Sequence, residues 1–397
     1  MVSQYLFNFK GILKTAPLYI IFLFIAVNCT GQTDGENNAQ ATTRLPDYTY
    51  TSTFFKKKYD TSHKFKYGFD TVYVTAYKER LAISLYQSQR SFEMGFRQNV
   101  LPDPLGISPL SYVARSSKVT GICVGYDKIS FSLGITTPIA ESEIVRKGKT
   151  KYYDYSLAFT GHAYRLELGF RSYKGFYEQN TPNYDSAFTD TSAYFQRPTM
   201  QNVLIKSKFL YFFNNRRFSY SAAYTNTYRQ LKTAGSLFAY SDIFYNALFD
   251  PNGFLPAQVD SLYGKYRTLA AFETYGMTLG GGYTFNLVMF HSLYINATFG
   301  LGCQLYQQNT LSYDGIINES RFKVGLTGAD VRGALGYNGK NFFISAILNF
   351  DISVYNASKV EVTANFISGC FSYGYRFKFK ERNWVKWMKN NRFYRML

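Results

Sequence analysis

The amino-acid sequence predicts an all-β fold: a transmembrane, antiparallel, up-and-down β-barrel of about 12 strands, within a range of roughly 12–14. Three observations lead to this prediction. Long segments alternate apolar with small or polar residues, the content of tyrosine and phenylalanine is high, and the N-terminus is typical of an exported protein. Together these features indicate location and shape far more strongly than they indicate an activity.

The clearest alternation lies between Thr268 and Gln308. Odd positions carry mostly apolar side chains on both sides of a short break near Met289, and even positions carry mostly glycine or polar residues. Successive side chains of a strand point to opposite faces, so the pattern indicates two strands, each with one apolar face. Strands of soluble proteins average about 5–6 residues. These two exceed the roughly 9–11 residues that cross a bilayer as a tilted strand.

The composition supports a barrel rather than a helical membrane protein. The 397 residues include 37 Tyr and 37 Phe but only 2 Trp. Tyrosine and phenylalanine suit lipid-facing strands and the interfacial girdles of a barrel. The mean hydropathy is negative, which a barrel tolerates because half of every strand is polar.

The net charge of +18 is spread through loops, strands and tail. It therefore indicates anionic lipid rather than nucleic acid as the surroundings of this chain.

Residues 1–31 are predicted to be a signal peptide. Two lysines precede the apolar core at 17–27, which is too short to span a membrane as a helix, and small residues follow it. Cleavage near Gly31 is the preferred interpretation. Lipid modification of Cys29 is an alternative that Asn28, directly before it, disfavours.

The mature chain divides into three predicted parts. Residues 32–69 form a polar, flexible periplasmic segment, residues 70–379 form the barrel, and residues 380–397 form a basic aromatic tail. The tail holds both tryptophans, Trp384 and Trp387, which we expect to anchor an interfacial helix. A frayed terminus is the alternative for the same residues.

Further strands are predicted from the same alternation. Apolar parity flips between the first two segments, which indicates a β-bulge or a tight turn between them. Long polar connections at 137–151 and 175–199 alternate with tight turns, as extracellular loops alternate with periplasmic turns in barrels. The predicted segments are 81–85, 92–96, 119–126, 129–135, 153–160, 164–174, 203–213, 218–228, 237–248, 322–337, 342–354 and 360–379.

Three short segments carry a family resemblance: Asp70 to Tyr86, Tyr173 to Tyr177, and Arg217 to Tyr224 with the nearby Lys232 to Ser236. They resemble the family known as domain of unknown function 4421, an uncharacterised family of Gram-negative outer-membrane barrel proteins. The resemblance covers about residues 70–379. It implies a barrel in the outer membrane, and it implies no activity.

The final predicted strand ends in alternating aromatic residues from Phe371 to Phe379. It looks like the terminal strand that barrel-assembly machinery recognises, so that machinery is an expected partner, together with outer-membrane lipid. We expect no nucleic-acid partner, and the sequence indicates no specific protein partner.

Charged residues on the small-polar faces are candidates for the barrel lumen. One interpretation is a set of ion pairs that fill a narrow interior. The other is a water-filled passage whose excess of positive charge favours anions. A barrel of about 12–14 strands lies between the filled and the open sizes, so size does not decide. The candidates are Glu93, Arg97, Arg165, Glu167, Arg171, Lys206, Lys208, Arg217, Arg229, Asp330, Arg332 and Asp351.

Catalytic, cofactor and metal sites are not expected. The chain has three histidines, His63, His162 and His291, and none lies in a pattern that pairs it with a nucleophile. Asp185 and Asp190 share a loop whose oxygen spacing matches no calcium-binding pattern.

The cysteines left after cleavage, Cys123, Cys303 and Cys370, are odd in number and far apart. They indicate neither a disulfide framework nor a metal site.

The sequence thus predicts a non-enzymatic protein of the cell outer membrane, exported by a cleaved signal peptide. The first functional hypothesis is a structural protein or a passive small-solute pore that favours anions. The alternative is a surface-exposed interaction module with a plugged barrel. An outer-membrane lipid or ester hydrolase is a further alternative that the sequence disfavours.

Overall fold

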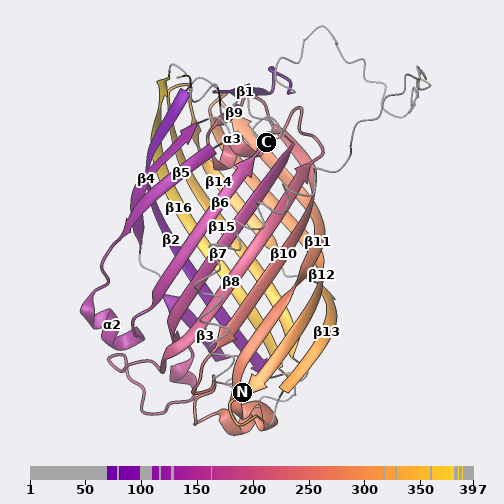
Figure 1. The fold of residues 1–397 in the computed structure, drawn as a ribbon. Helices are drawn as coiled ribbons and strands as arrows, with labels where there is room; N and C mark the ends of the chain where they lie inside the picture. The colour runs from indigo at the N-terminus through magenta and orange to yellow at the C-terminus, as the bar shows by residue number, and fades with distance from the viewer. Residues whose placement is uncertain are drawn as a thin grey trace, which may run out of the picture. The chain divides into compact units, whose positions relative to one another are not determined.

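A computed structural model describes residues 69–77, 80–98, 110–115, 118–126, 129–161, 163–315, 318–326, 329–357 and 360–379, with Asn383 and Trp387. The predicted signal peptide and nearly all of the predicted periplasmic segment lie outside the described residues. The regular secondary structure within these ranges is mostly β-strand (Figure 1).

Among the described residues, fourteen strands form one antiparallel sheet, and two short strands, β1 (Val74–Ala76) and β9 (Tyr228–Gln230), form a separate pair. Short helical segments are α2 (Glu141–Lys147), α3 (Tyr220–Tyr224) and the 3-10 turns η1 (Thr181–Asn183) and η2 (Asp260–Thr268). The strands of the sheet are β2 (Arg80–Gln98), β3 (Leu110–Arg115), β4 (Val119–Tyr126), β5 (Ile129–Thr136), β6 (Lys151–Thr160), β7 (Tyr164–Glu178), β8 (Gln196–Phe212), β10 (Ala234–Phe249), β11 (Leu269–Met289), β12 (Leu293–Ser312), β13 (Asn318–Leu326), β14 (Asp330–Asn338), β15 (Phe342–Ala357) and β16 (Val360–Lys378).

The sheet closes on itself through the first and last long strands. β16 pairs antiparallel with β2 over a continuous register from Val360 opposite Gln98 to Lys378 opposite Arg80. Ten strands make the closed ring in the order β2, β16, β15, β14, β12, β11, β10, β8, β7, β3. This pairing gives the backbone groups of β2 and β16 partners on their facing edges, which a strand in hydrocarbon requires. The predicted antiparallel barrel is confirmed.

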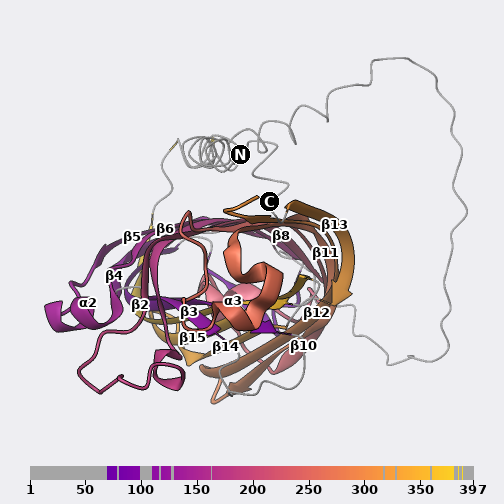
Figure 2. The same cartoon turned by 90° about the horizontal axis from the view of Figure 1, so that it is seen from below.

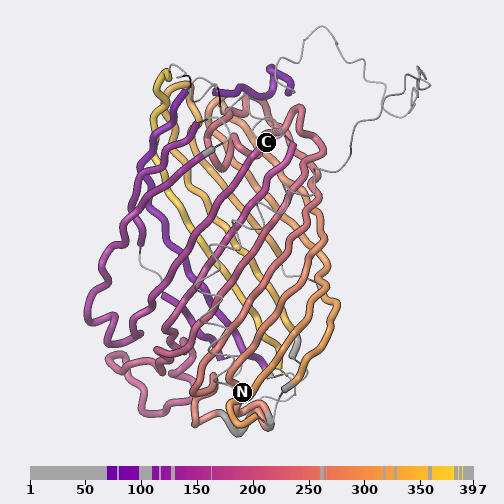
Figure 3. Tube along the Cα trace, in the orientation of Figure 1, coloured from indigo at the N-terminus to yellow at the C-terminus, as the bar shows by residue number. Residues whose placement is uncertain are grey.

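Four strands lie outside this ring but extend its wall. β3 and β4 pair with successive parts of β2, and β13 and β14 pair with successive parts of β12. β5 pairs with β4, and β6 pairs with β7. The wall therefore has about twelve positions, within the predicted range. Figure 3 shows the strands running obliquely to the long axis of the barrel.

The faces of β11 and β12 are those that the alternation predicts. On β11 the outward side chains of Tyr275, Leu279 and Tyr283 are 46–56% exposed, whereas the inward Thr274 and Thr278 are at most 1% exposed. An apolar exterior over a polar interior reverses the arrangement of a soluble protein and is typical of a membrane-spanning barrel. Within the described residues, no helix has the length and apolar character needed to cross a bilayer.

The flip of apolar parity in β2 has a different cause from the predicted one. β2 is one uninterrupted strand, with no bulge and no turn. Leu81 and Leu85 point outward in the apolar belt, while Phe92 and Met94 point into a buried interior core further along the same strand. The interior changes from polar to apolar along the barrel, so the strand changes its pattern while keeping its register.

The predicted strand at 218–228 is not a strand of the wall. Its residues form α3 and lead into β9, and Figure 2 shows α3 inside the ring of strands. Tyr220 and Ala223 are buried there against the inner faces of the wall, and Ala222 packs with Val74 of β1 and Tyr228 of β9.

The two ends of the barrel differ in their connections. At one end, named the short-turn end, tight turns join β6 to β7, β11 to β12 and β14 to β15. The opposite, long-loop end carries the connection with α2, the segment between β7 and β8, and the segment between β10 and β11. The long connections predicted at 137–151 and 175–199 therefore alternate with tight turns as expected. Exceptions are the short connection between β15 and β16 at the long-loop end and the long insertion between β8 and β10 at the short-turn end.

The close packing around Gly282 explains why this inward position of β11 holds a glycine. A Cβ atom on Gly282 would overlap the carbonyl oxygen of Phe299 and approach the Phe238 ring to 2.6 Å, whereas a Cβ on Gly281, on the other face, would come no closer than 3.2 Å to another residue. We expect Gly282→Ala to destabilise the barrel by about 1–3 kcal/mol through overpacking. Urea titration followed by the heat-modifiable gel shift measures this, with Gly281→Ala as the matched control. Equal midpoints for the two variants would contradict it.

Candidate functional site: a charged layer between two plugs

An apolar layer fills the barrel near the long-loop end. Residues 250–268, named the long-end plug, fold inward between β10 and β11 and place Phe254, Val259 and Tyr263 in the core. Phe254 stacks beside Phe96 of β2 at 5.4 Å, and the Tyr263 hydroxyl donates to the Phe96 carbonyl at 3.1 Å. This layer draws side chains from β2, β3, β7, β8, β10, β11, β12, β15 and β16, so it spans the interior.

The long-end plug begins at a buried carboxyl group. Asp250 accepts the backbone N–H of Asn252 at 3.0 Å and the hydroxyl of Thr199 at 2.9 Å. Burial raises the pKa of the Asp250 carboxyl, and the two hydrogen bonds oppose that shift. These contacts fix the point at which the chain leaves the wall.

A second plug enters from the short-turn end. Residues 214–233, named the short-end plug, carry α3 and β9, with β1 paired to β9. Tyr220 stacks on Phe212 of β8 at 5.1 Å, and Tyr220 and Tyr224 stack on each other at 4.3 Å. The aromatic rings of the plug thus pack against the inner face of the wall.

Wall side chains satisfy the backbone of the short-end plug. Asn338 of β14 donates to the carbonyls of Ala222 and Tyr228, both at 2.9 Å. The fully buried Arg376 of β16 donates twice to the Asn226 carbonyl, at 2.6 and 3.1 Å. Buried irregular backbone needs such partners, so the inward polar residues of the wall hold the plug in place.

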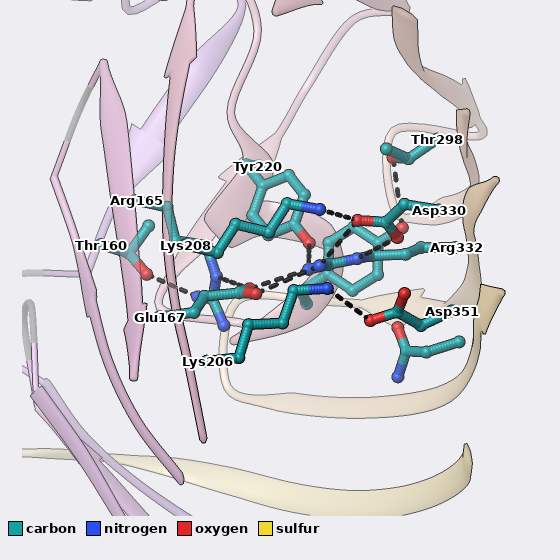
Figure 4. A network of polar contacts seen from close by, with 12 residues as sticks. Thr160, Arg165, Glu167, Lys206, Lys208, Tyr220, Thr298, Asp330, Arg332 and Asp351 are labelled. Atoms are coloured by element: carbon teal, nitrogen blue, oxygen red, sulfur yellow. Dashed lines mark hydrogen bonds and ion pairs between the residues drawn. The ribbon is translucent and has the colours of Figure 1, made fainter. Parts of the chain in front are cut away.

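A charged layer lies between the two plugs and connects opposite sides of the wall (Figure 4). Arg332 of β14 reaches both carboxylate oxygens of Glu167 on β7, at 2.8 and 3.1 Å. The same guanidinium donates to Asp330 at 2.9 Å and to the Tyr220 hydroxyl of the short-end plug at 2.8 Å. Arg332 is therefore bound by two carboxylates and ties the plug to both sides of the barrel.

Two lysines of β8 extend the layer. Lys206 lies 2.8 Å from an Asp351 carboxylate oxygen and 3.7 Å from one of Asp242, and Lys208 pairs with Asp330. Asp330 and Asp351 face each other as direct partners on β14 and β15. Neighbouring carboxylates repel, and the two lysines offset this repulsion.

A further group of charges lies beside β6. The carboxylate of Asp154 is 2.6 Å from Arg90 of β2 and 3.6 Å from Arg171 of β7. The Arg171 guanidinium also lies 3.6 Å from the centre of the Phe366 ring. A cavity of about 300 Å³ separates this group from Arg332 and its partners and is lined by both.

The described charges of this layer nearly balance. Its cationic residues exceed its anionic residues by one, so the positive charge inside the barrel is far smaller than the net charge of the whole chain suggests. The cationic members are Arg90, Arg165, Arg171, Lys206, Lys208 and Arg332, and the anionic members are Asp154, Glu167, Asp242, Asp330 and Asp351.

The structure brings eight of the twelve candidate lumen residues together in this layer. These eight are Arg165, Glu167, Arg171, Lys206, Lys208, Asp330, Arg332 and Asp351.

The other four candidates lie elsewhere. Glu93 and Arg97 are on the outward face of β2, because the inward positions there are Phe92, Met94 and Phe96. Arg217 and Arg229 belong to the short-end plug: Arg217 lies over the Tyr73 ring, and Arg229 donates to the His291 carbonyl.

Four important polar residues were not among the candidates: Arg90, Asp154, Asp242 and Arg376. Asp242 lies directly opposite Lys208 in the register of β10 and β8, and Asp154 directly opposite Arg171 in that of β6 and β7. Opposite charges at matching inward parity on neighbouring strands were the available signal for these two aspartates.

The remaining sequence candidates do not form a site in the described part of the chain. His63, His162 and Trp384 lie outside the described residues, and Trp387 is 72% exposed. His291 occupies a tight turn with a positive φ of 60°. No cluster of metal-binding side chains occurs among the described residues, and the three described cysteines are unpaired.

The family model described as a domain of unknown function, DUF4421, matches residues 69–377. No curated protein matches the chain.

Among solved structures, the outer membrane protease OmpT from Escherichia coli shares 9% identity at a TM-score of 0.34, covering 76% of this chain and 98% of its own. The toluene transporter TodX of P. putida shares 7% identity at a TM-score of 0.23, and the match covers 76% of this chain and 91% of TodX. The translocator domain of autotransporter NalP from Neisseria meningitidis shares 8% identity at a TM-score of 0.27, and the match covers 78% of this chain and 91% of that domain. At such low TM-scores these likenesses carry no argument about activity.

Loss of Arg332 tests the importance of the charged layer. Arg332→Met leaves Glu167 and Asp330 without their shared cation, and breaking a buried pair on one side typically costs about 3–5 kcal/mol. We expect a loss of this order in urea titrations. Arg321→Ala, which removes an exposed arginine paired with Glu319, should cost about 0–1 kcal/mol. Equal costs for both variants would contradict a structural role for the layer.

Proposed function

We propose that this chain, which belongs to the DUF4421 family, is a closed barrel of the outer membrane that presents a surface-exposed interaction module. Two plugs and a charged layer in the described interior, spanning from wall to wall, are the observation that carries the proposal. A passive pore needs a continuous aqueous path, and these layers oppose one. The near balance of charge in the layer also gives little basis for selecting anions.

The apolar belt supports residence in a lipid bilayer, with outer-membrane lipid as the surrounding partner. Barrels of this type carry short turns on the periplasmic side and long loops outside the cell. We therefore assign the long-loop end to the cell exterior. The outward aromatic residues Phe371, Tyr373, Tyr375 and Phe377 of β16 suit recognition by barrel-assembly machinery.

The long-loop end is built as a defined surface. Arg115 pairs with Glu143 of α2, and the Tyr194 ring contacts Phe188 at 5.1 Å and the Arg146 guanidinium at 5.8 Å. Loops that are ordered before binding lose less conformational entropy when a partner docks. This preformed surface favours an interaction module over a purely structural barrel. In this proposal the chain has no catalytic role.

Planar-bilayer recording tests whether the barrel is closed. We expect the refolded wild-type protein to show the heat-modifiable gel shift of a folded barrel and no conductance steps. Discrete steps whose anion preference weakens in Arg165→Ala and Arg171→Ala would overturn the proposal and support the passive pore. Lys378→Ala, at the short-turn end of β16, serves as a control for general loss of positive charge.

Cysteine labelling on intact cells tests location and orientation. Val145 of α2 and Phe290 of a tight turn are both exposed, at opposite ends of the barrel. In a background without Cys123, Cys303 and Cys370, we expect Val145→Cys to react with a membrane-impermeant maleimide on whole cells. Phe290→Cys should react only after the outer membrane is permeabilised. The reverse pattern would contradict the orientation, and no labelling of either variant on whole cells would contradict surface exposure.

A further inference from the structure

The barrel wall is interrupted between β5 and β6. β5 pairs with β4 along its whole length, and β6 pairs with β7 along its whole length. Within the described ranges, no backbone pairing joins β5 to β6. Unpaired backbone groups are costly in hydrocarbon and are tolerated only where water or polar groups reach them. This gap therefore needs a polar occupant.

The gap lies within the apolar belt of the barrel. On β5 the outward side chains of Phe131, Leu133 and Ile135 are 63–79% exposed, and on β6 those of Tyr153 and Tyr155 are 58–61% exposed. Side chains of this kind face lipid in a membrane barrel. Both edges of the gap are thus bordered by the hydrocarbon region of the bilayer rather than by water.

The interior cavity lies beside β6, which forms one border of this gap. Its lining includes the inward residues Asp154, Ser156 and Ala158 of β6. Ser156 is exposed although it points inward. Since β7 pairs with one edge of β6, any passage from the cavity toward the bilayer lies on the β5 side.

Positive charge is concentrated where the cavity meets β6. The Asp154 carboxylate, whose side chain is 3% exposed, is shared by the guanidinium groups of Arg90 and Arg171. The buried Nε of Arg171 forms no hydrogen bond with the described residues. Two guanidinium groups on one carboxylate leave a net positive charge, and guanidinium binds phosphate and carboxylate oxygens in pairs.

We propose that the gap between β5 and β6 admits an anionic amphiphile from the surrounding bilayer. Its phosphate or carboxylate head group lies in the gap and binds at Arg90 and Arg171, and its acyl chain lies along the outward apolar side chains of the two strands. The cavity volume of about 300 Å³ is at the lower end of ligand sites and suits a head group rather than a whole lipid. This site requires neither an open lumen nor a protein partner, so it goes beyond the closed interaction module.

Photo-crosslinking tests the site in the full-length protein, refolded in neutral dodecyl maltoside micelles. The probe is a diazirine-bearing palmitic acid, and mass spectrometry maps the labelled peptides. We expect labelling on β5 and β6 that dodecyl phosphate competes away, while dodecanol and inorganic phosphate do not. Effective competition by dodecanol would show that the head group is not recognised. Competition by inorganic phosphate would show a site for soluble anions. Either result would overturn the proposal.

Variants separate the site from the fold. Arg171→Ala should lower the labelling of β5 and β6 by about tenfold or more, because it removes a charge-assisted contact. Arg171→Lys should retain part of it. Ser156→Trp should block the passage while leaving both guanidinium groups in place. If Arg171→Ala does not show the heat-modifiable gel shift of a folded barrel, the labelling of Ser156→Trp tests the site instead. Arg97→Ala, which removes an outward arginine near the long-loop end, should change nothing. Unchanged labelling in Ser156→Trp would refute the passage.

Discussion

Backbone hydrogen bonding in a medium without water is the constraint on which the rest of this structure depends. The register between β2 and β16 closes the ring and removes the lipid-facing edges that these two strands would otherwise have. Once the ring is closed, its exterior is necessarily apolar and its interior must be filled by polar groups, plugs or water. The gap between β5 and β6 is a departure from this rule among the described strands, and for that reason it marks a place where function can reside.

The interior is filled in three layers of different chemistry. The long-end plug packs aromatic rings against the wall, the charged layer joins opposite strands, and the short-end plug is held by amides and Arg376. Buried ion pairs stabilise less than their Coulomb energy suggests because desolvation offsets it. Such ion pairs do, however, favour one placement of the plug against the wall over alternative placements. Arg332 satisfies Glu167, Asp330 and Tyr220 together in this arrangement, which ties the position of α3 to the register of the wall.

The alternation in the sequence was sufficient to predict the strands of the wall, because a two-residue period alone decides which face of β11 or β12 meets lipid. It was insufficient where the environment changes along one strand. Phe92 and Met94 follow the same period as Leu81 and Leu85, but they pack against a plug folded from residues far away in the sequence. Glu93 was consequently assigned to the wrong face. Local pattern carries no information about such distant packing.

The short-end plug was missed for a related reason. Its alternation is broken by Ala222 and Ala223 and by Asn226, a residue type that tolerates the positive φ of 54° found there. Those features could have indicated an irregular segment. The partners that make this segment stable, Asn338 and Arg376, come from β14 and β16 and resemble ordinary inward polar residues. Likewise Asp242 and Asp154 gain significance only when the register sets them opposite Lys208 and Arg171.

The position of Arg376 in the chain has a consequence for assembly. The short-end plug precedes β10 in the sequence, but the guanidinium that binds the Asn226 carbonyl belongs to β16, the last strand of the wall. The carbonyl of Asn226 therefore acquires this partner only when the final strand has taken its place beside the others. This contact of the plug thus depends on the same strand that closes the ring by pairing with β2.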